Sequence, residues 1–540
     1  MRALSKWADL ARSQVVAAKS YVSDLSGPLF ATPLSAPLSG PARSTLKLVA
    51  GSAGAGLLTA GVATAVTGPW QSGQRVAERS WAAARDGVNR AIAAEYRIAP
   101  VPSAPAVLTG IDAAGVTTAN GLGSPEKPLP TSQGLNAALG PLFNAPALGG
   151  IRTGAVLDAA TGRELFDHQA DLPTAPASTT KIATAVAALE TLGPDFTIPT
   201  TVVPGPGPGT IVLAGGGDPT LTAAAPSPEA GPSAHPASLA ALADATAKAL
   251  RVHGTTKVKL AYDTSRYTGP EVHPIGRNDN IAPVTALMTD EGRVDPNSTE
   301  SAPRVADPAA SAAQSFAGML QARGITVSGT PAPATAPVPF RSSGPSGTTI
   351  AQIRSMPLSA LVERMLTNSD NDIAEALARQ TAIGAHQPAD FPGGATAVSR
   401  ALAKLGLPLG GTVFLDGSGL AREDRLTAGL LARLLATAAS PAHPKLRSVL
   451  SGLPIAGFTG TLSDRFNASD NSDHDGASAA GLVHAKTGTL TGVNTLAGTV
   501  VDANGRLLVF AFMTSGTSDP NAAVATLDRL ATVVTGCGCR

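Results

Sequence analysis

Strand patterns occur in two groups that lie far apart in the chain, and this separation constrains the fold more than any other feature. The first group is a hairpin, because Ala155–Leu157 and Glu164–Phe166 flank an Asp-Ala-Ala-Thr-Gly turn. The second group consists of three strands, over residues 482–489, 494–502 and 506–514. Helical patterns follow the hairpin and close the chain, over residues 178–192 and 520–534. We therefore predict an α/β (α+β) fold, in which helices cover a sheet and a smaller domain interrupts it.

The chain of 540 residues is too long for one ordinary core, and its composition suggests where it divides. Residues 68–150 combine a short amphipathic helix, over 71–96, with a Pro/Ala-rich linker. The predicted sheet domain consists of two segments, 151–196 and 346–540. The predicted inserted domain covers residues 197–345 and contains a helix near Leu239–Val252.

A run of twenty residues without charge, 48–67, is about long enough to cross a bilayer as a helix. Six basic and two acidic residues precede it in segment 1–47, which favours a cytoplasmic N-terminus and an exported remainder. The run is either an uncleaved signal anchor or a signal peptide cut after Ala65, and a buried soluble helix is a third reading. Segment 1–47 is either a cytoplasmic tail or an over-long predicted start. We expect a protein outside the cytoplasmic membrane, anchored or secreted.

Charge and composition exclude several classes of function. With 40 basic and 39 acidic residues, and only 4% aromatic residues, nothing points to nucleic acid as a partner. The eight histidines show no metal-ligand spacing, so we expect neither a metal nor another cofactor. The two cysteines, Cys537 and Cys539, form either a local disulfide or a pair of tail thiols, and neither carries the chemistry.

A nucleophilic serine needs a base within hydrogen-bond reach, and Ser178-Thr-Thr-Lys181 supplies one on the same helical face. Lys181 acts as a base only if its pKa falls well below the usual value of about 10.4. Ser44-Thr-Leu-Lys47 and Ser124-Pro-Glu-Lys127 match the same pattern. Because only Ser178 opens a long apolar helix, we predict that Ser178 is the nucleophile.

Ser369-Asp370-Asn371 stands at the start of another predicted helix, where serine and asparagine are also good caps. The same tripeptide recurs at Ser469, in a polar stretch that we interpret as a solvated loop. Capping and catalysis are compatible, so Ser369 and Asn371 are candidate site residues.

Lys486-Thr487-Gly488-Thr489 occurs once, on a predicted strand. We expect Lys486 and both threonines on one face, with Gly488 on the other, where it lets a neighbouring backbone approach closely. An ordinary surface turn is the alternative reading of this motif.

In the order Ser-x-x-Lys, Ser-x-Asn, Lys-Thr-Gly, the three motifs resemble those of the penicillin-recognising serine enzymes. The long gap between the first two motifs is similar to that of the D-alanyl-D-alanine carboxypeptidase/endopeptidase group, low-molecular-mass class C penicillin-binding proteins. Three further stretches resemble this group: Leu213–Leu221, Asp416–Leu420 and Leu453–Leu462. The resemblance covers roughly residues 150–540. It implies a β-lactamase/transpeptidase-like domain with a five-stranded antiparallel sheet.

The resemblance also implies roles for the motif residues. Ser178 would attack the penultimate D-alanine of a peptidoglycan stem peptide, Lys181 would take its proton, and Ser369 would relay a proton to the leaving amine. Asn371 would hold the peptide amide, and the Lys486–Thr489 motif would bind the terminal carboxylate. β-Lactam antibiotics would act as inhibitors. A β-lactamase and a catalytically degenerate wall-binding relative are the alternatives, and the preference between carboxypeptidase and endopeptidase stays open.

Overall fold

The computed structural model describes residues 128–224, 235–298, 301–336, 349–466 and 479–538. Segment 1–47, the apolar run 48–67 and the predicted helix over 71–96 therefore lie outside the described residues, as does the second Ser-Asp-Asn sequence. Within the described ranges, no helix is both long enough and apolar enough to span a membrane.

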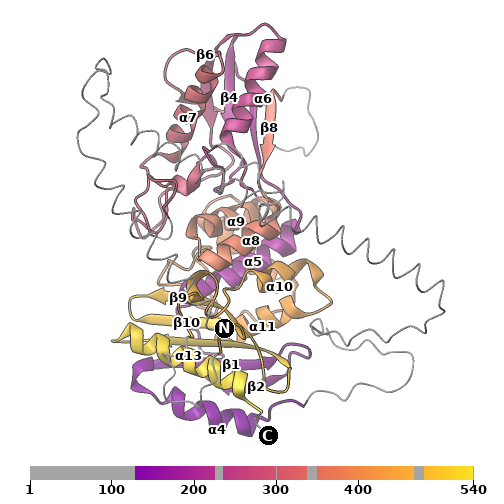
Figure 1. Cartoon of the computed structure of the whole chain (residues 1–540), viewed down its shortest axis with the longest axis vertical. Helices are drawn as coiled ribbons and strands as arrows, with labels where there is room; N and C mark the ends of the chain where they lie inside the picture. The colour runs from indigo at the N-terminus through magenta and orange to yellow at the C-terminus, as the bar shows by residue number, and fades with distance from the viewer. Residues whose placement is uncertain (1–127, 225–234, 299–300, 337–348, 467–478, 539–540) are drawn as a thin grey trace, which may run out of the picture. The chain divides into compact units, whose positions relative to one another are not determined.

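A five-stranded antiparallel sheet forms the core of the first domain, and it confirms the predicted fold class (Figure 1). Its strand order is β2-β1-β11-β10-β9. The strands are β1 (Ile151–Asp158), β2 (Glu164–His168), β9 (Val483–Leu490), β10 (Val493–Val501) and β11 (Leu507–Ser515). The N-terminal hairpin thus pairs with the last strand of the chain, as the two groups of strand patterns required.

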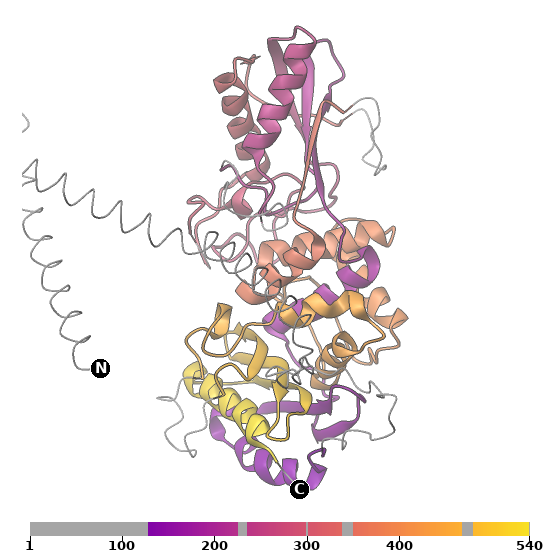
Figure 2. The same ribbon diagram turned by 45° about the vertical axis from the view of Figure 1, so that its right-hand side comes forward.

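Alternating side chains give the sheet two buried faces, each with its own helices. Val509 and Ala511 of β11 face a large cluster that includes helix α5 (Thr180–Leu192), whereas Leu508 and Phe510 face the other cluster. The other helices in the first layer are α8 (Leu358–Asn368), α9 (Asn371–Gly384), α10 (Phe391–Lys404), α11 (Ala428–Ala439) and α12 (Arg447–Ser451). The opposite face is covered by α13 (Pro520–Gly536) and α4 (Ser132–Phe143), which contact each other (Figure 1 and Figure 2).

Helix α4 corrects the prediction that residues 68–150 end in a linker. Thr131 caps the helix by accepting a hydrogen bond from the Gly134 amide. Leu135, Leu139 and Phe143 are spaced four residues apart and are fully buried against the sheet domain. The Pro/Ala/Gly-rich composition of the surrounding segment obscured this short apolar stripe, so the sheet domain begins earlier than predicted.

The inserted domain contains a six-stranded mixed sheet with the order β6-β5-β4-β3-β8, in which β7 also pairs with β5. Its strands are β3 (Pro199–Pro204), β4 (Thr210–Ala214), β5 (Lys257–Asp263), β6 (Thr326–Val327), β7 (Ala332–Pro333) and β8 (Ala351–Arg354). Helices α6 (Leu239–Val252) and α7 (Pro308–Ala322) pack together and bury the core residues Leu242 and Phe316. The domain ends at β8 rather than at residue 345, because β8 pairs with β3.

Cys537, directly after α13, is buried and disulfide-bonded. The sequence left open whether this cysteine is a free thiol or part of a disulfide, and the structure has it in a disulfide. It lies in the cluster under α13, away from the polar site described next.

Candidate active site

Ser178 lies in a 3-10 turn, Ala177–Thr179, that leads directly into α5. The residue before it, Ala177, has a φ of 48°, in the left-handed region that few residues other than glycine adopt. Two hydroxyl groups hold this turn by donating to the carbonyl oxygen of Pro176: Thr179 at 2.6 Å and Thr495 at 2.9 Å. Such a fixed, unusual backbone just before a serine is typical of a functional site.

Lys181 lies in the first turn of α5, one turn after Ser178, and is fully buried. Its Nζ lies 2.9 Å from Ser178 Oγ, 2.7 Å from Asn371 Oδ1 and 2.8 Å from the carbonyl oxygen of Ser418. Burial lowers the pKa of Lys181 to about 8, although the charges of Asp416 and Glu375 oppose the shift. A neutral amine keeps two N–H donors for Asn371 and Ser418 and turns its lone pair to the serine hydroxyl, which is the geometry a general base needs.

The pKa of Lys181 predicts the pH dependence of any acylation of Ser178. Only the neutral amine accepts a proton, so the acylation rate should rise about tenfold per pH unit and level off near pH 8. Rates of β-lactam acylation measured between pH 5 and 10 test this profile. A rate that stays constant from pH 5 to 8 would contradict the role of a lysine base.

The Ser369-Asp370-Asn371 motif forms the junction between α8 and α9. Ser369 ends α8 in the left-handed conformation, with φ 58° and ψ 34°. Asp370 rather than Ser369 or Asn371 caps α9, by accepting a hydrogen bond from the Ile373 amide at 2.8 Å. Asn371 contacts Lys181 and also donates from Nδ2 to the carbonyl oxygen of Asn280 at 2.9 Å. This asparagine therefore joins the first motif to the inserted domain.

The Lys486–Thr489 motif lies on β9 at the edge of the sheet, next to the turn that carries Ser178. Lys486 and Gly488 are buried, whereas Thr487 and Thr489 line the pocket beside Ser178. The prediction that Lys486 and the two threonines share one face was wrong, because alternate residues of a strand point to opposite faces. Burial, together with the charge of Lys181, holds the pKa of Lys486 well below its usual value.

Gly488 lies where the backbone before Ser178 passes closest to β9. A Cβ atom added there would lie 2.8 Å from the Pro176 carbonyl oxygen and 2.1 Å from Thr495 Oγ1. Gly488→Ala should therefore push away the turn that carries Ser178. The free energy of unfolding should fall by about 1–3 kcal/mol, and acylation of Ser178 should slow. Gly410→Ala is the matched control, because no atom lies within 4 Å of its added Cβ. Thermal unfolding and acylation rates compare the two, and equal effects would contradict the prediction.

A pocket of about 850 Å³ brings the motif residues together with the inserted domain. Its volume suits a short peptide or a drug-sized ligand. The sheet domain contributes Ser178, Ser369, Asn371, Thr487 and Thr489. The inserted domain contributes Thr220, Thr222, Asn280, Asp290, Glu291, Arg293 and Arg304. The pocket thus has one wall with Ser178, the predicted nucleophile, and another with many polar and charged groups.

Ser418 and Thr461 are among the residues that contact the motifs and were not predicted as site residues. The carbonyl oxygen of Ser418 accepts the hydrogen bond from Lys181, and Thr461 contacts Thr487 with 2.9 Å between the hydroxyl oxygens. Both lie in stretches singled out for their resemblance, Asp416–Leu420 and Leu453–Leu462. The signal was therefore present in the sequence, but no spacing rule connects these stretches to the lysine.

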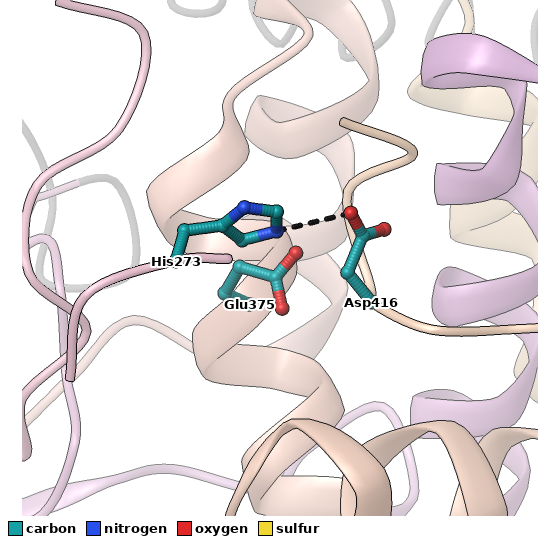
Figure 3. Close-up of side chains that lie close together, drawn as sticks. All are labelled: His273, Glu375 and Asp416. Carbon is teal, nitrogen blue, oxygen red and sulfur yellow. Dashed lines mark hydrogen bonds and ion pairs between the residues drawn. The ribbon is translucent and has the colours of Figure 1, made fainter. Parts of the chain in front are cut away.

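Two groups of buried side chains among the described residues have the composition of metal ligands: His273, Glu375 and Asp416 (Figure 3), and Glu291, Asp370 and Asp372. Protein donors engage both groups. His273 contacts Asp416 directly at 3.0 Å, and Glu375 accepts hydrogen bonds from two backbone amides. In the second group, Glu291 pairs with Arg293 and Arg364, and Asp372 pairs with Arg304. These contacts make both groups ion-pair and hydrogen-bond networks.

The model of the D-Ala-D-Ala carboxypeptidase 3 (S13) family matches residues 135–303 and 295–534. The chain belongs to this family. It is 39% identical to carboxypeptidase DacB of Mycolicibacterium smegmatis over 419 residues, which cover 76% of this chain and 86% of that protein. It is 29% identical to the D-alanyl-D-alanine carboxypeptidase of an Actinomadura species, over 72% of this chain and 82% of the relative.

A solved structure supports the fold assignment of this family member. Penicillin binding protein 4 (dacB) from Haemophilus influenzae matches with a TM-score of 0.56 and 21% identity, over 73% of this chain and 97% of that chain. At this identity the likeness concerns the fold.

Proposed function

We propose that the protein is a serine D-alanyl-D-alanine carboxypeptidase that trims peptidoglycan stem peptides through an acyl-enzyme on Ser178. One observation carries the proposal: the buried Nζ of Lys181 lies 2.9 Å from Ser178 Oγ, and Asn371 and Ser418 occupy its other donors. Membership of the S13 family and a relative named D-alanyl-D-alanine carboxypeptidase support the choice of substrate.

The proposed reaction has two steps. Ser178 Oγ attacks the carbonyl carbon of the penultimate D-alanine, and its proton moves to Lys181. Ser369 relays a proton to the nitrogen of the terminal D-alanine, which leaves as the free amino acid. Water then attacks the ester, Lys181 again accepts a proton, and Ser178 is regenerated with release of the shortened peptide.

Substrate binding falls to the groups that surround Ser178 in the pocket. Asn371 would hold the amide of the peptide, and Lys486, Thr487 and Thr489 would bind its terminal carboxylate. The backbone N–H groups of Ser178 and Thr489 would stabilise the oxyanion, and each such donor contributes about 3 kcal/mol. Lys486 is buried, donates to the Thr487 carbonyl oxygen at 2.8 Å, and shares a strand face with Gly488, which lies against the turn that carries Ser178.

The proposed place of action is the cell envelope, outside the cytoplasmic membrane, with residues 48–67 as an anchor or signal segment. Peptidoglycan is the substrate in this compartment, and penicillins would acylate Ser178 as inhibitors. Cleavage of cross-linked peptides is a second possible activity of the same site, since it needs the same nucleophile and base.

The test follows two products from the same purified protein. Incubation with a peptide that ends in D-Ala-D-Ala should release free D-alanine, and prior treatment with penicillin should block this release through a long-lived adduct. Fast turnover of penicillin without release of D-alanine would identify a β-lactamase instead. Failure to act on either compound would indicate a catalytically degenerate wall-binding protein.

A further inference from the structure

A histidine of the inserted domain contacts the sheet domain at Asp416, close to Ser418, whose carbonyl oxygen accepts a hydrogen bond from Lys181. His273 follows β5, and its Nε2 lies 3.0 Å from Oδ2 of Asp416 (Figure 3). The side chains of His273 and Asp416 are 0% and 1% exposed. The imidazole ring also packs edge-on against Phe391, with 5.1 Å between the ring centroids. Packing on one side and a carboxylate on the other fix the position of the imidazole.

The hydrogen bonds of His273 define what the ring does. The backbone N–H of Ile275 donates to Nδ1 at 3.3 Å, so Nδ1 acts as an acceptor. A neutral ring with an acceptor at Nδ1 carries its proton on Nε2. His273 therefore donates to Asp416 from Nε2, and a neutral donor of similar reach could replace it.

Asp416 holds a tight loop that spans residues 416–421. Its carboxylate accepts hydrogen bonds from the backbone amides of Ser418 at 3.1 Å, Gly419 at 2.6 Å and Ala421 at 2.7 Å. Glu375 of α9 also accepts hydrogen bonds from the backbone amides of Gly417 and Ser418. The two carboxylates thus hold the loop together, and the Ser418 N–H is shared between them.

The loop contacts both parts of the proposed catalytic pair. The Ser418 carbonyl oxygen accepts the hydrogen bond from Lys181 at 2.8 Å. Gly419 lies so close to the residue before the nucleophile that an added Cβ would be 1.9 Å from the Ala177 carbonyl oxygen. A shift of the loop would therefore change the aim of Lys181 and move the turn that carries Ser178.

We propose that His273 is a positioning residue, through which the inserted domain orients the Asp416–Ala421 loop and hence the Lys181–Ser178 pair. This proposal rests on the proposed function, since it concerns the rate at which Ser178 is acylated. His273 touches neither the nucleophile nor the base. Its effect is on their geometry, and a misplacement of about 1 Å at a reacting group costs up to about 100-fold in rate.

The same domain contact offers a matched control that does not involve the loop. Tyr267 also follows β5 and is buried, and its hydroxyl group contacts the carbonyl oxygens of Gly217 and Ala376. Ala376 lies in α9, so Tyr267 also joins the inserted domain to the sheet domain. Tyr267→Phe removes this contact without a change at Asp416.

The experiment compares His273→Ala, His273→Gln and Tyr267→Phe in the full chain. For each, stopped-flow measurements with a penicillin separate the dissociation constant of the first complex from the acylation rate constant, and thermal unfolding gives the midpoint. We expect His273→Ala to lower the acylation rate constant by up to about 100-fold with little change in the dissociation constant. His273→Gln should restore most of the rate, because its amide still donates. Tyr267→Phe should retain the parent rate even if its midpoint falls.

Equal acylation rate constants for His273→Ala and the parent would overturn the proposal, as would equal losses in His273→Ala and Tyr267→Phe. If His273→Ala does not fold, His273→Leu replaces it, because leucine fills the space without a donor. Failure of the parent protein itself to be acylated would contradict the proposed function, and this outcome is distinct from failure of the positioning role.

Discussion

Ser178→Ala should abolish covalent labelling of the protein by a fluorescent penicillin. The acyl-enzyme is an ester of Ser178 Oγ, and alanine has no atom that can form it. Release of D-alanine should fall by about 10⁶-fold, the loss that removal of the nucleophile causes in a serine protease. Gel fluorescence and the mass of the intact protein measure the adduct, and thermal unfolding shows that the variant is folded.

The sequence itself supplies matched controls for this variant. Ser124→Ala disrupts the competing Ser-x-x-Lys sequence, and Ser469→Ala disrupts the second Ser-x-Asn sequence. Both variants should be labelled as strongly as the parent. If labelling persists in Ser178→Ala but disappears in Ser124→Ala, the nucleophile is Ser124 and the prediction of Ser178 is wrong.

Periodicity predicted the core of the fold because each element has one clear pattern. The predicted helix near Leu239–Val252 is found with the same bounds, and the three late strands differ from prediction by one residue at each end. The N-terminal hairpin and the last strand are far apart in sequence, yet nearly every residue of β1 and β11 is buried, on both faces of the sheet. Their pairing, Ala155 opposite Ala511 for instance, follows from the need to bury both faces.

Two of the elements that the sequence analysis missed have weak local signals. Helix α4 is short, contains Pro141 and lies in a Pro/Ala-rich segment, so its three buried apolar residues were not recognised. Strand β8 has four residues, too few for its alternation to stand out in the sequence, and its pairing with β3 defines it. Tertiary contacts determine both elements, which local patterns do not reveal.

The site shows the same division between local and long-range information. The motifs name Ser178, Lys181 and Asn371, and the helical spacing alone places the serine and the lysine together. Lys181 also donates hydrogen bonds to Asn371 and to the Ser418 carbonyl oxygen. These contacts depend on how α5, α9 and the loop after Phe414 pack together. Positive φ angles at Ala177 and Ser369 are likewise invisible in sequence, since neither residue is glycine.

Lys181→Met should lower the acylation rate constant by about 10²–10⁴-fold, because a thioether cannot accept the proton of Ser178. Methionine fills much of the same buried space, but it leaves the oxygens of Asn371 and Ser418 without their donor, which lowers the free energy of unfolding by about 1–3 kcal/mol. The rate of penicillin acylation should therefore fall in a variant that is still folded, with an unfolding midpoint below that of the parent. The pH dependence seen in the parent below pH 8 should also disappear, because its titrating group is gone.

Lys181→Arg separates the proton-accepting role of Lys181 from its positive charge. An arginine keeps the charge and can still donate to Asn371 and Ser418, but its guanidinium does not lose a proton in a protein. If Lys181 is the base, Lys181→Arg should be as slow as Lys181→Met at every pH up to 10. If the lysine only stabilises negative charge near Ser178, the arginine variant should keep much of the parent rate and the assignment of the base would pass to another group in the pocket. The two variants together therefore decide between a base and a fixed charge, which the 2.9 Å contact with Ser178 Oγ alone does not do.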